Sequence, residues 1–167
     1  MLFRSSLFFA VLSLSLGAGW ATAQTRKTWT DAEVMKVHRS AILIDTHNDV
    51  TSKTVEGFEL GKPSAEGHTD IPRMKQGGMT AEFFAAYVGT NYMASNGSAH
   101  RVLQMIDTIR HDIAEKYPNE MVFTTTAAGI VKAKKQHKIA ALIGIEGGHA
   151  IEDDVRLLRD YYALGVR

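Results

Sequence analysis

The chain has 167 residues, with 19 Lys and Arg against 18 Asp and Glu, and 45% of its residues are hydrophobic. This is an ordinary globular composition without excess charge, and it argues against nucleic acid as a partner because phosphate binding requires a clustered basic surface. Cysteine is absent, so disulfides and thiolate ligands are excluded, and any metal must be held by His, Asp or Glu.

Residues 1–23 are predicted to be a secretory signal peptide, and residues 24–167 the mature part of the protein. Arg4 precedes an apolar stretch over residues 7–16, and Ala21-Thr22-Ala23 is typical of a signal-peptidase site. The apolar stretch is short for a bilayer span, although an uncleaved anchor is the alternative. We therefore expect an exported protein, periplasmic or extracellular, with no stable membrane span after cleavage. The lack of cysteine favours a bacterial periplasm.

A helix is predicted over residues 30–40, where Thr30 and Glu33 have the spacing of a capping box. The apolar residues 41–44 that follow are predicted to be a strand buried on both faces. His47 and Asp49 come directly after it. In extended backbone these two side chains point the same way, and a nitrogen donor beside an oxygen donor suits zinc or a similar divalent ion better than calcium or magnesium. The structural alternative is a loop histidine hydrogen-bonded to a neighbour.

The middle of the chain predicts a loop, a strand and two helices. Residues 51–72 are polar and lack periodicity, which indicates a functional loop. A solvated or capping role is expected for its His68 and Asp70, and contact with a ligand is the alternative. Residues 79–88 are predicted to form a second apolar strand, and residues 99–117 a helix with an apolar stripe. Another helix is expected from the caps at residues 124–126 to about residue 137. The basic residues near its end are expected to decorate a solvated face.

A third buried strand is predicted over residues 139–145, and it too ends in a potential ligand, Glu146. Two glycines after Glu146 allow a sharp turn. A helix is expected over residues 152–164, with its inner stripe formed by Val155, Leu158 and Tyr162. The last two residues resemble the start of another strand.

Strands that alternate with helices predict a parallel α/β fold with right-handed crossovers. In such folds the catalytic residues gather beyond the carboxyl ends of the strands, and two of the three predicted strands carry ligand candidates there. One carboxylate can bridge two cations, so Glu146 is a candidate to join a metal at His47 and Asp49 to a second metal, as in two-metal hydrolases. Three ligands do not complete such a site.

Three separated motifs resemble the membrane (renal) dipeptidase family of zinc peptidases. They are Ile44-Asp45-Thr46-His47-Asn48-Asp49, then His68-Thr69-Asp70-Ile71-Pro72-Arg73, and then Leu142-Ile143-Gly144-Ile145-Glu146-Gly147-Gly148-His149 followed by a Leu-rich helix. The resemblance runs from about Thr30 to the last residue. It implies a (β/α)8 TIM-type barrel and the hydrolysis of dipeptides, including dipeptides with a D residue or a dehydro residue in second position.

The resemblance also implies roles for individual residues. His47 and Asp49 would be ligands of the first zinc, and Glu146 would bridge both zinc ions of the complete enzyme. The family's remaining histidine ligands and substrate-binding residues would lie beyond Arg167, so this chain resembles the N-terminal part of the barrel, truncated before the barrel closes. We assign no catalytic or substrate-binding residue.

From this resemblance we expect a zinc-dependent dipeptidase whose substrate is a dipeptide, and we leave a homodimer open. The fragment itself is expected to be inactive. Two alternatives remain. One is another metal-dependent amidohydrolase on the same barrel, although such enzymes usually have His-x-His where this chain has His-x-Asp. The other is a non-catalytic truncated remnant or a partial gene model.

Overall fold

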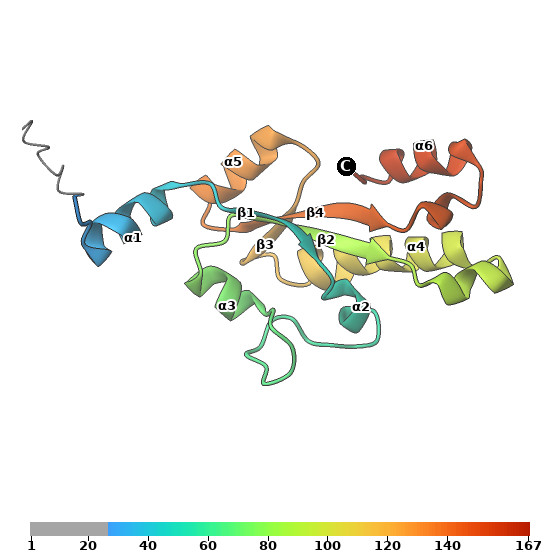
Figure 1. Ribbon diagram of the computed structural model, residues 1–167, viewed down its shortest axis with the longest axis horizontal. Helices are drawn as coiled ribbons and strands as arrows, with labels where there is room; N and C mark the ends of the chain where they lie inside the picture. The colour runs from blue at the N-terminus through green and yellow to red at the C-terminus, as the bar shows by residue number, and fades with distance from the viewer. Residues whose placement is uncertain (1–26) are drawn as a thin grey trace, which may run out of the picture.

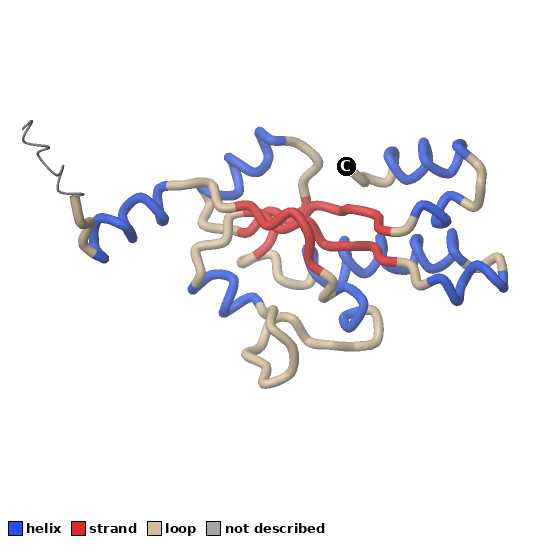
Figure 2. The backbone as a smooth tube through the Cα atoms, in the orientation of Figure 1, coloured by secondary structure: helices blue, strands red, loops and turns tan. Residues whose placement is uncertain are grey.

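A four-stranded parallel sheet organises the structure, a computed structural model that describes residues 27–167 (Figure 1). The predicted signal peptide lies outside these residues. The sheet has the order β1-β2-β4-β3, and helices lie on both of its faces (Figure 2). The strands are β1 (Ile44–Asn48), β2 (Ala81–Tyr87), β3 (Met121–Phe123) and β4 (Ile139–Glu146). Val166 makes a parallel bridge to Ile143, as expected for the start of a further strand.

The helices fall largely where the sequence predicts them, and side-chain caps fix several of their ends. Thr30 and Glu33 form the expected capping box of the first helix, and the Thr126 hydroxyl accepts a hydrogen bond from the Gly129 amide. The helical segments are α1 (Asp31–Ser40), α2 (Thr51–Thr54), α3 (Ile71–Gln76), η1 (Thr90–Ser95), α4 (Ser98–Asp107), η2 (Thr108–Glu115), α5 (Ala127–Lys135), η3 (Gly148–Ile151) and α6 (Val155–Ala163). The predicted helix over residues 99–117 is α4 continued by η2, a π-helix.

The hydrophobic core lies on both faces of β2 and β4. On one face, Phe84 packs with side chains of α4 and η2 such as Val102 and Ile109. On the other face, Ala81 and Leu142 pack with the buried side of α5. Because both faces are covered, β2 and β4 read as nearly continuous apolar runs, which is why the sequence reveals them.

The first strand differs from its prediction. Residues 41–44 were expected to be buried on both faces, but Ile42 is 45% exposed and Ile44 is 39% exposed. The strand also begins later, at Ile44. The reason is its position: β1 is an edge strand, and no described helix packs extensively on it, whereas α4 packs on β2 and α5 on β4.

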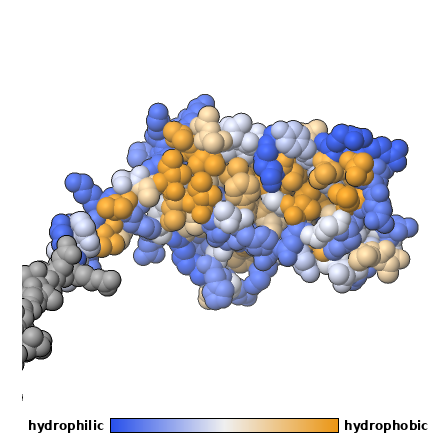
Figure 3. Space-filling model, turned by 45° about the horizontal axis from the view of Figure 1, so that its top comes forward, coloured by the Kyte–Doolittle hydropathy of each residue, from blue (hydrophilic) through white to orange (hydrophobic). Residues whose placement is uncertain are grey.

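The inner face of α6 also differs from its prediction. Val155, Leu158 and Tyr162 are 61%, 54% and 62% exposed, whereas Tyr161 is buried and its hydroxyl donates a hydrogen bond of 2.8 Å to the Ala150 carbonyl. The predicted apolar stripe is therefore not buried, and two of its members, Leu158 and Tyr162, line an open pocket instead. Figure 3 shows hydrophobic side chains gathered in two areas of the face that carries α5 and α6.

Two smaller features complete the fold. The short strand β3 was not predicted, because three residues give too little pattern to recognise. The predicted loop over residues 51–72 contains the four-residue α2 at its start and meets α3 at its end. Among the described helices, none has both the length and the apolar character needed to cross a bilayer.

Candidate metal centre

His47 and Asp49 stand at the C-terminal end of β1, where the strand leaves regular pairing. Its register with β2 shifts between Asp45 and Asn48. The His47 amide donates to the Asp45 carboxylate over 3.1 Å, and the Asn48 side chain accepts from the Val50 amide over 3.0 Å. These local bonds turn the chain sharply after the strand. They leave His47 Nε2 and Asp49 Oδ1 3.3 Å apart.

Glu146 reaches the same place from β4. It is the last residue of that strand, and it pairs in register with Tyr87 at the end of β2. Since β2 lies between β1 and β4, His47 and Glu146 meet across its C-terminal end, with Nε2 and Oε2 3.0 Å apart. Gly147 follows with a φ of +105°, and a Cβ there would lie 2.7 Å from the His149 ring. Glycine is therefore needed directly after Glu146.

The three donor atoms suit a single divalent cation. One atom each from His47, Asp49 and Glu146 lie within 4.8 Å of one another. Ligands bound tetrahedrally at about 2.0–2.2 Å from zinc would be about 3.3–3.6 Å apart, close to the two shorter separations seen here. A nitrogen with two carboxylate oxygens is also a ligand set that zinc accepts. About half of each side chain is exposed, so the position remains open on one side.

A pocket of about 560 Å³ with a mixed polar and apolar lining opens beside these ligands. His47 and Glu146 form part of its wall, and Arg167 stands at its edge. The other lining residues are Thr46, Phe83, Gly144 and Ile145. A substrate group in this pocket would lie directly beside the metal position.

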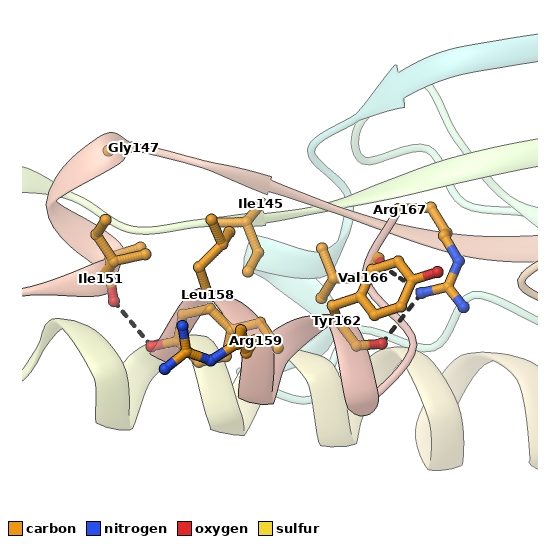
Figure 4. Close-up of a pocket in the computed structure, with 11 residues that line it drawn as sticks. Ile145, Gly147, Ile151, Leu158, Arg159, Tyr162, Val166 and Arg167 are labelled. Carbon is orange, nitrogen blue, oxygen red and sulfur yellow. Dashed lines mark hydrogen bonds between the residues drawn. The ribbon is translucent and has the colours of Figure 1, made fainter. Parts of the chain in front are cut away.

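A second, wider pocket contains none of the three ligands. Its volume is about 980 Å³, and it lies between the end of β4 and α6. Figure 4 shows Ile145 and Leu158 directed into it, with Tyr162 beside Arg167. The Arg167 guanidinium lies 3.9 Å from the centre of the Tyr162 ring. This lining is mostly apolar and offers packing rather than hydrolytic chemistry.

The other predicted polar residues do not join the three ligands. Asp70 is fully buried and caps α3, where it accepts 2.8 Å and 2.6 Å hydrogen bonds from the Arg73 amide and Nε. This confirms its capping role. His68 is exposed in the loop and lines a small pocket next to Asp49. His149, the last residue of the third sequence motif, donates from Nε2 to the Val88 carbonyl over 2.9 Å.

Sequence reasoning missed one polar residue near the site, Glu82 of β2. Its side chain is fully buried, opposite Asp45 of β1. Burial, with a further contribution from the negative charge of Asp45, raises the pKa of Glu82 from 4.5 to about 8. The signal in the sequence was an acid inside an apolar strand, since Glu82 stands between Ala81 and Phe83.

Comparison with known proteins decides the family. The profile of the family described as membrane dipeptidase (peptidase family M19) matches residues 31–167. This chain belongs to the membrane dipeptidase family. Dipeptidase 3 of Mus musculus is 30% identical over 141 residues, which are 81% of this chain and 27% of the mouse protein. An uncharacterized dipeptidase of Schizosaccharomyces pombe is 30% identical over 152 residues, covering 79% of this chain and 36% of the yeast protein.

Solved structures show the same fold. A metallo peptidase from Rhodobacter sphaeroides, liganded with a phosphinate mimic of the dipeptide L-Ala-D-Ala, superposes with a TM-score of 0.65 at 23% identity. The match covers 75% of this chain and 44% of that structure. The predicted α/β fold, part of a (β/α)8 barrel, is therefore confirmed. The chain spans 27% to 36% of the length of the two curated membrane dipeptidase relatives described above.

Proposed function

We propose that this chain supplies the first ligands of a zinc-dependent dipeptidase site. The observation that carries the proposal is the convergence of His47, Asp49 and Glu146 beyond the C-terminal ends of β1 and β4, in a member of the membrane dipeptidase family. The family match favours a dipeptidase over another amidohydrolase, because it extends from α1 to the end of the chain.

Each of the three side chains has a distinct task in this proposal. Neutral His47 offers its Nε2 lone pair, and Asp49 and Glu146 supply negative charge that offsets a dication. Zinc bound there would lower the pKa of a water molecule towards 7 and polarise the peptide carbonyl of a dipeptide. Glu146 has a second carboxylate oxygen beyond the one near His47, so it is the residue suited to bridge two cations.

The described residues fall short of a complete binuclear centre. Three ligand atoms can hold one zinc weakly, but a second zinc would rest on Glu146 alone, fewer than the three protein ligands usual for catalytic zinc. We therefore propose that the 167-residue chain by itself binds at most one zinc and does not turn over dipeptides. Lost substrate orientation alone removes many orders of magnitude in rate.

Zinc stoichiometry and dipeptide hydrolysis on the purified chain test this proposal. Glu146→Gln keeps the size of the side chain and removes its charge, and it should weaken zinc binding at least about tenfold. Glu120→Gln is the matched control, because Glu120 is a partly exposed carboxylate that pairs with Lys75 and is not one of the three ligands. Equal zinc affinity in the two variants would refute the ligand role of Glu146. Two zinc ions per chain with measurable turnover would refute the expected inactivity.

We also propose that the protein is exported, with cleavage after Ala23. The support is the order of charged, apolar and small residues over residues 4–23. Mass spectrometry of the mature N-terminus is the test. A mature protein that begins at Met1 would refute cleavage.

A further inference from the structure

Glu82 is a fully buried carboxyl group without a hydrogen-bond partner among the described residues. Its exposed fraction is 0%, and neither carboxylate oxygen makes a hydrogen bond of normal geometry. Leaving such a group unpaired in the interior costs several kcal/mol when it is charged, so burial favours its neutral form. A neutral carboxyl carries one O–H that can donate. A neutral Glu82 would therefore need a hydrogen-bond acceptor close to its O–H.

The groups that face Glu82 belong to the strand that carries the metal ligands. Asp45 is its register partner on β1, and the charge of Asp45 acts directly on it. The Asn48 side chain also acts on it, in the direction that favours the charged form. Asp45 and Asn48 enclose His47 on both sides along the chain. Glu82 therefore lies near both ends of residues 45–48, the segment that carries His47.

This segment of β1 has little else to hold it. It lies at the edge of the sheet, and its regular pairing with β2 is interrupted between Asp45 and Asn48. Outside β1 itself, the Asn48 amide reaches Thr69 in the loop over 3.1 Å. The position of His47 relative to Glu146 therefore depends on how firmly Asp45 and Asn48 are held against β2.

We propose that Glu82 is a positioning residue of the candidate metal centre: its carboxyl group braces β1 at Asp45 and Asn48 and so keeps His47 in line with Glu146. This inference rests on the proposed function for its metal readout, but the brace itself is a property of the sheet. A neutral Glu82 would donate its O–H to the carboxylate of Asp45, its register partner on β1. Asp45 in turn accepts a hydrogen bond from the His47 amide, so a fixed Asp45 carboxylate also fixes the backbone of the ligand residue His47.

Three substitutions of Glu82 separate bracing from simple packing. Glu82→Gln keeps the length and a donor group, Glu82→Leu removes all polarity, and Glu82→Asp keeps the acid but withdraws it by one methylene. Phe84→Leu is the matched control, because Phe84 is fully buried two residues further along β2 and carries no polar group. All variants are compared in the complete chain at pH 7. The folded fraction of each is measured by circular dichroism.

The first readout is zinc affinity, measured by competition with a chelator. Glu82→Leu and Glu82→Asp should weaken zinc binding about 10- to 100-fold, the usual effect of losing a partner that orients a metal ligand. Glu82→Gln should remain within about threefold of the wild type, and Phe84→Leu should bind zinc normally once the folded fraction is taken into account. If Phe84→Leu weakens binding as much as Glu82→Leu does, Glu82 is only a packing residue.

The second readout, amide hydrogen exchange without metal, tests the brace even if the chain binds no zinc. Glu82→Leu and Glu82→Asp should speed exchange of the Thr46 and His47 amides at least about tenfold, while β4 amides remain protected and Glu82→Gln behaves like the wild type. Exchange that rises equally in β1 and β4 would overturn the proposal. A wild-type chain without zinc affinity but with this exchange pattern would refute the proposed metal function and leave the brace supported.

Discussion

Replacing Glu82 with glutamine should stabilise the protein, and the gain should grow with pH. The folded-state pKa of Glu82 is about 8, against 4.5 in the unfolded chain. Below pH 4.5 Glu82 is neutral in both states, and it does not lower the free energy of unfolding. As the pH rises from 4.5 to 8, the free energy of unfolding falls, because the unfolded chain releases a proton that the folded chain keeps. Each pH unit in that window is worth about 1.36 kcal/mol.

The magnitude follows from the width of this window. Between pH 4.5 and 7 the wild type loses about 3 kcal/mol of stability through Glu82, and by pH 9 the loss reaches about 5 kcal/mol. Glutamine has the same shape and does not titrate. The stability difference between Glu82→Gln and the wild type should therefore rise by about 3 kcal/mol from pH 4 to pH 7, and then level off above pH 8.

Urea denaturation at pH 4, 5, 6, 7, 8 and 9, followed by circular dichroism, measures this difference directly. Glu120→Gln is the control: Glu120 is a partly exposed carboxylate in an ion pair with Lys75, and its loss should give a small difference at every pH tested. A constant gain for Glu82→Gln across the whole pH range would refute the reasoning, because it would mean that the carboxyl group is not held neutral by the fold. A gain that decreases with pH would refute its sign.

Three further predictions concern side chains with defined partners. Asp70→Ala should cost about 3 kcal/mol in urea denaturation, since it leaves the Arg73 guanidinium without its buried acid. Burial alone would raise the pKa of Asp70, but the hydrogen bonds from Arg73 and Ser64 lower it overall, so this contribution to stability should be lost as the pH falls below the ordinary value of 3.8. Tyr161→Phe should cost about 1 kcal/mol in thermal denaturation by removing the bond to Ala150. In calorimetric titration with zinc, His47→Ala should abolish the binding heat.

The parts of the fold that the sequence predicted are those that local interactions determine. The cap formed by Thr30 and Glu33 involves residues three apart, and it appears in the structure as expected. Strands β2 and β4 are covered on both faces, so their apolar runs identify them without knowledge of their neighbours. The ligand candidates follow from the same logic, because parallel strands bring their carboxyl ends to one edge.

The failed predictions concern contacts between distant segments. The apolar residues 41–44 resemble a buried strand, but burial on both faces requires a covering layer on each face, and no described helix packs extensively on β1. In α6, both the stripe containing Leu158 and the side containing Tyr161 are apolar enough to face a core. The structure buries the side with Tyr161, whose hydroxyl bonds to the Ala150 carbonyl, and the periodicity of the helix does not reveal this bond.

Glu82 shows where sequence reasoning about a site reaches its limit. A glutamate in an apolar strand can point to solvent, pair with a cation or be buried neutral, and the sequence allows all three. The structure decides among them, because Glu82 is fully buried and the register between β1 and β2 places another acid, Asp45, opposite it. Burial raises the pKa of Glu82, and the charge of Asp45 raises it further, so the chemistry of Glu82 depends on the packing around β2 and on a pairing between residues 37 positions apart. Ligands can be predicted from their own strand, but the residues that hold them in place depend on the neighbouring strand.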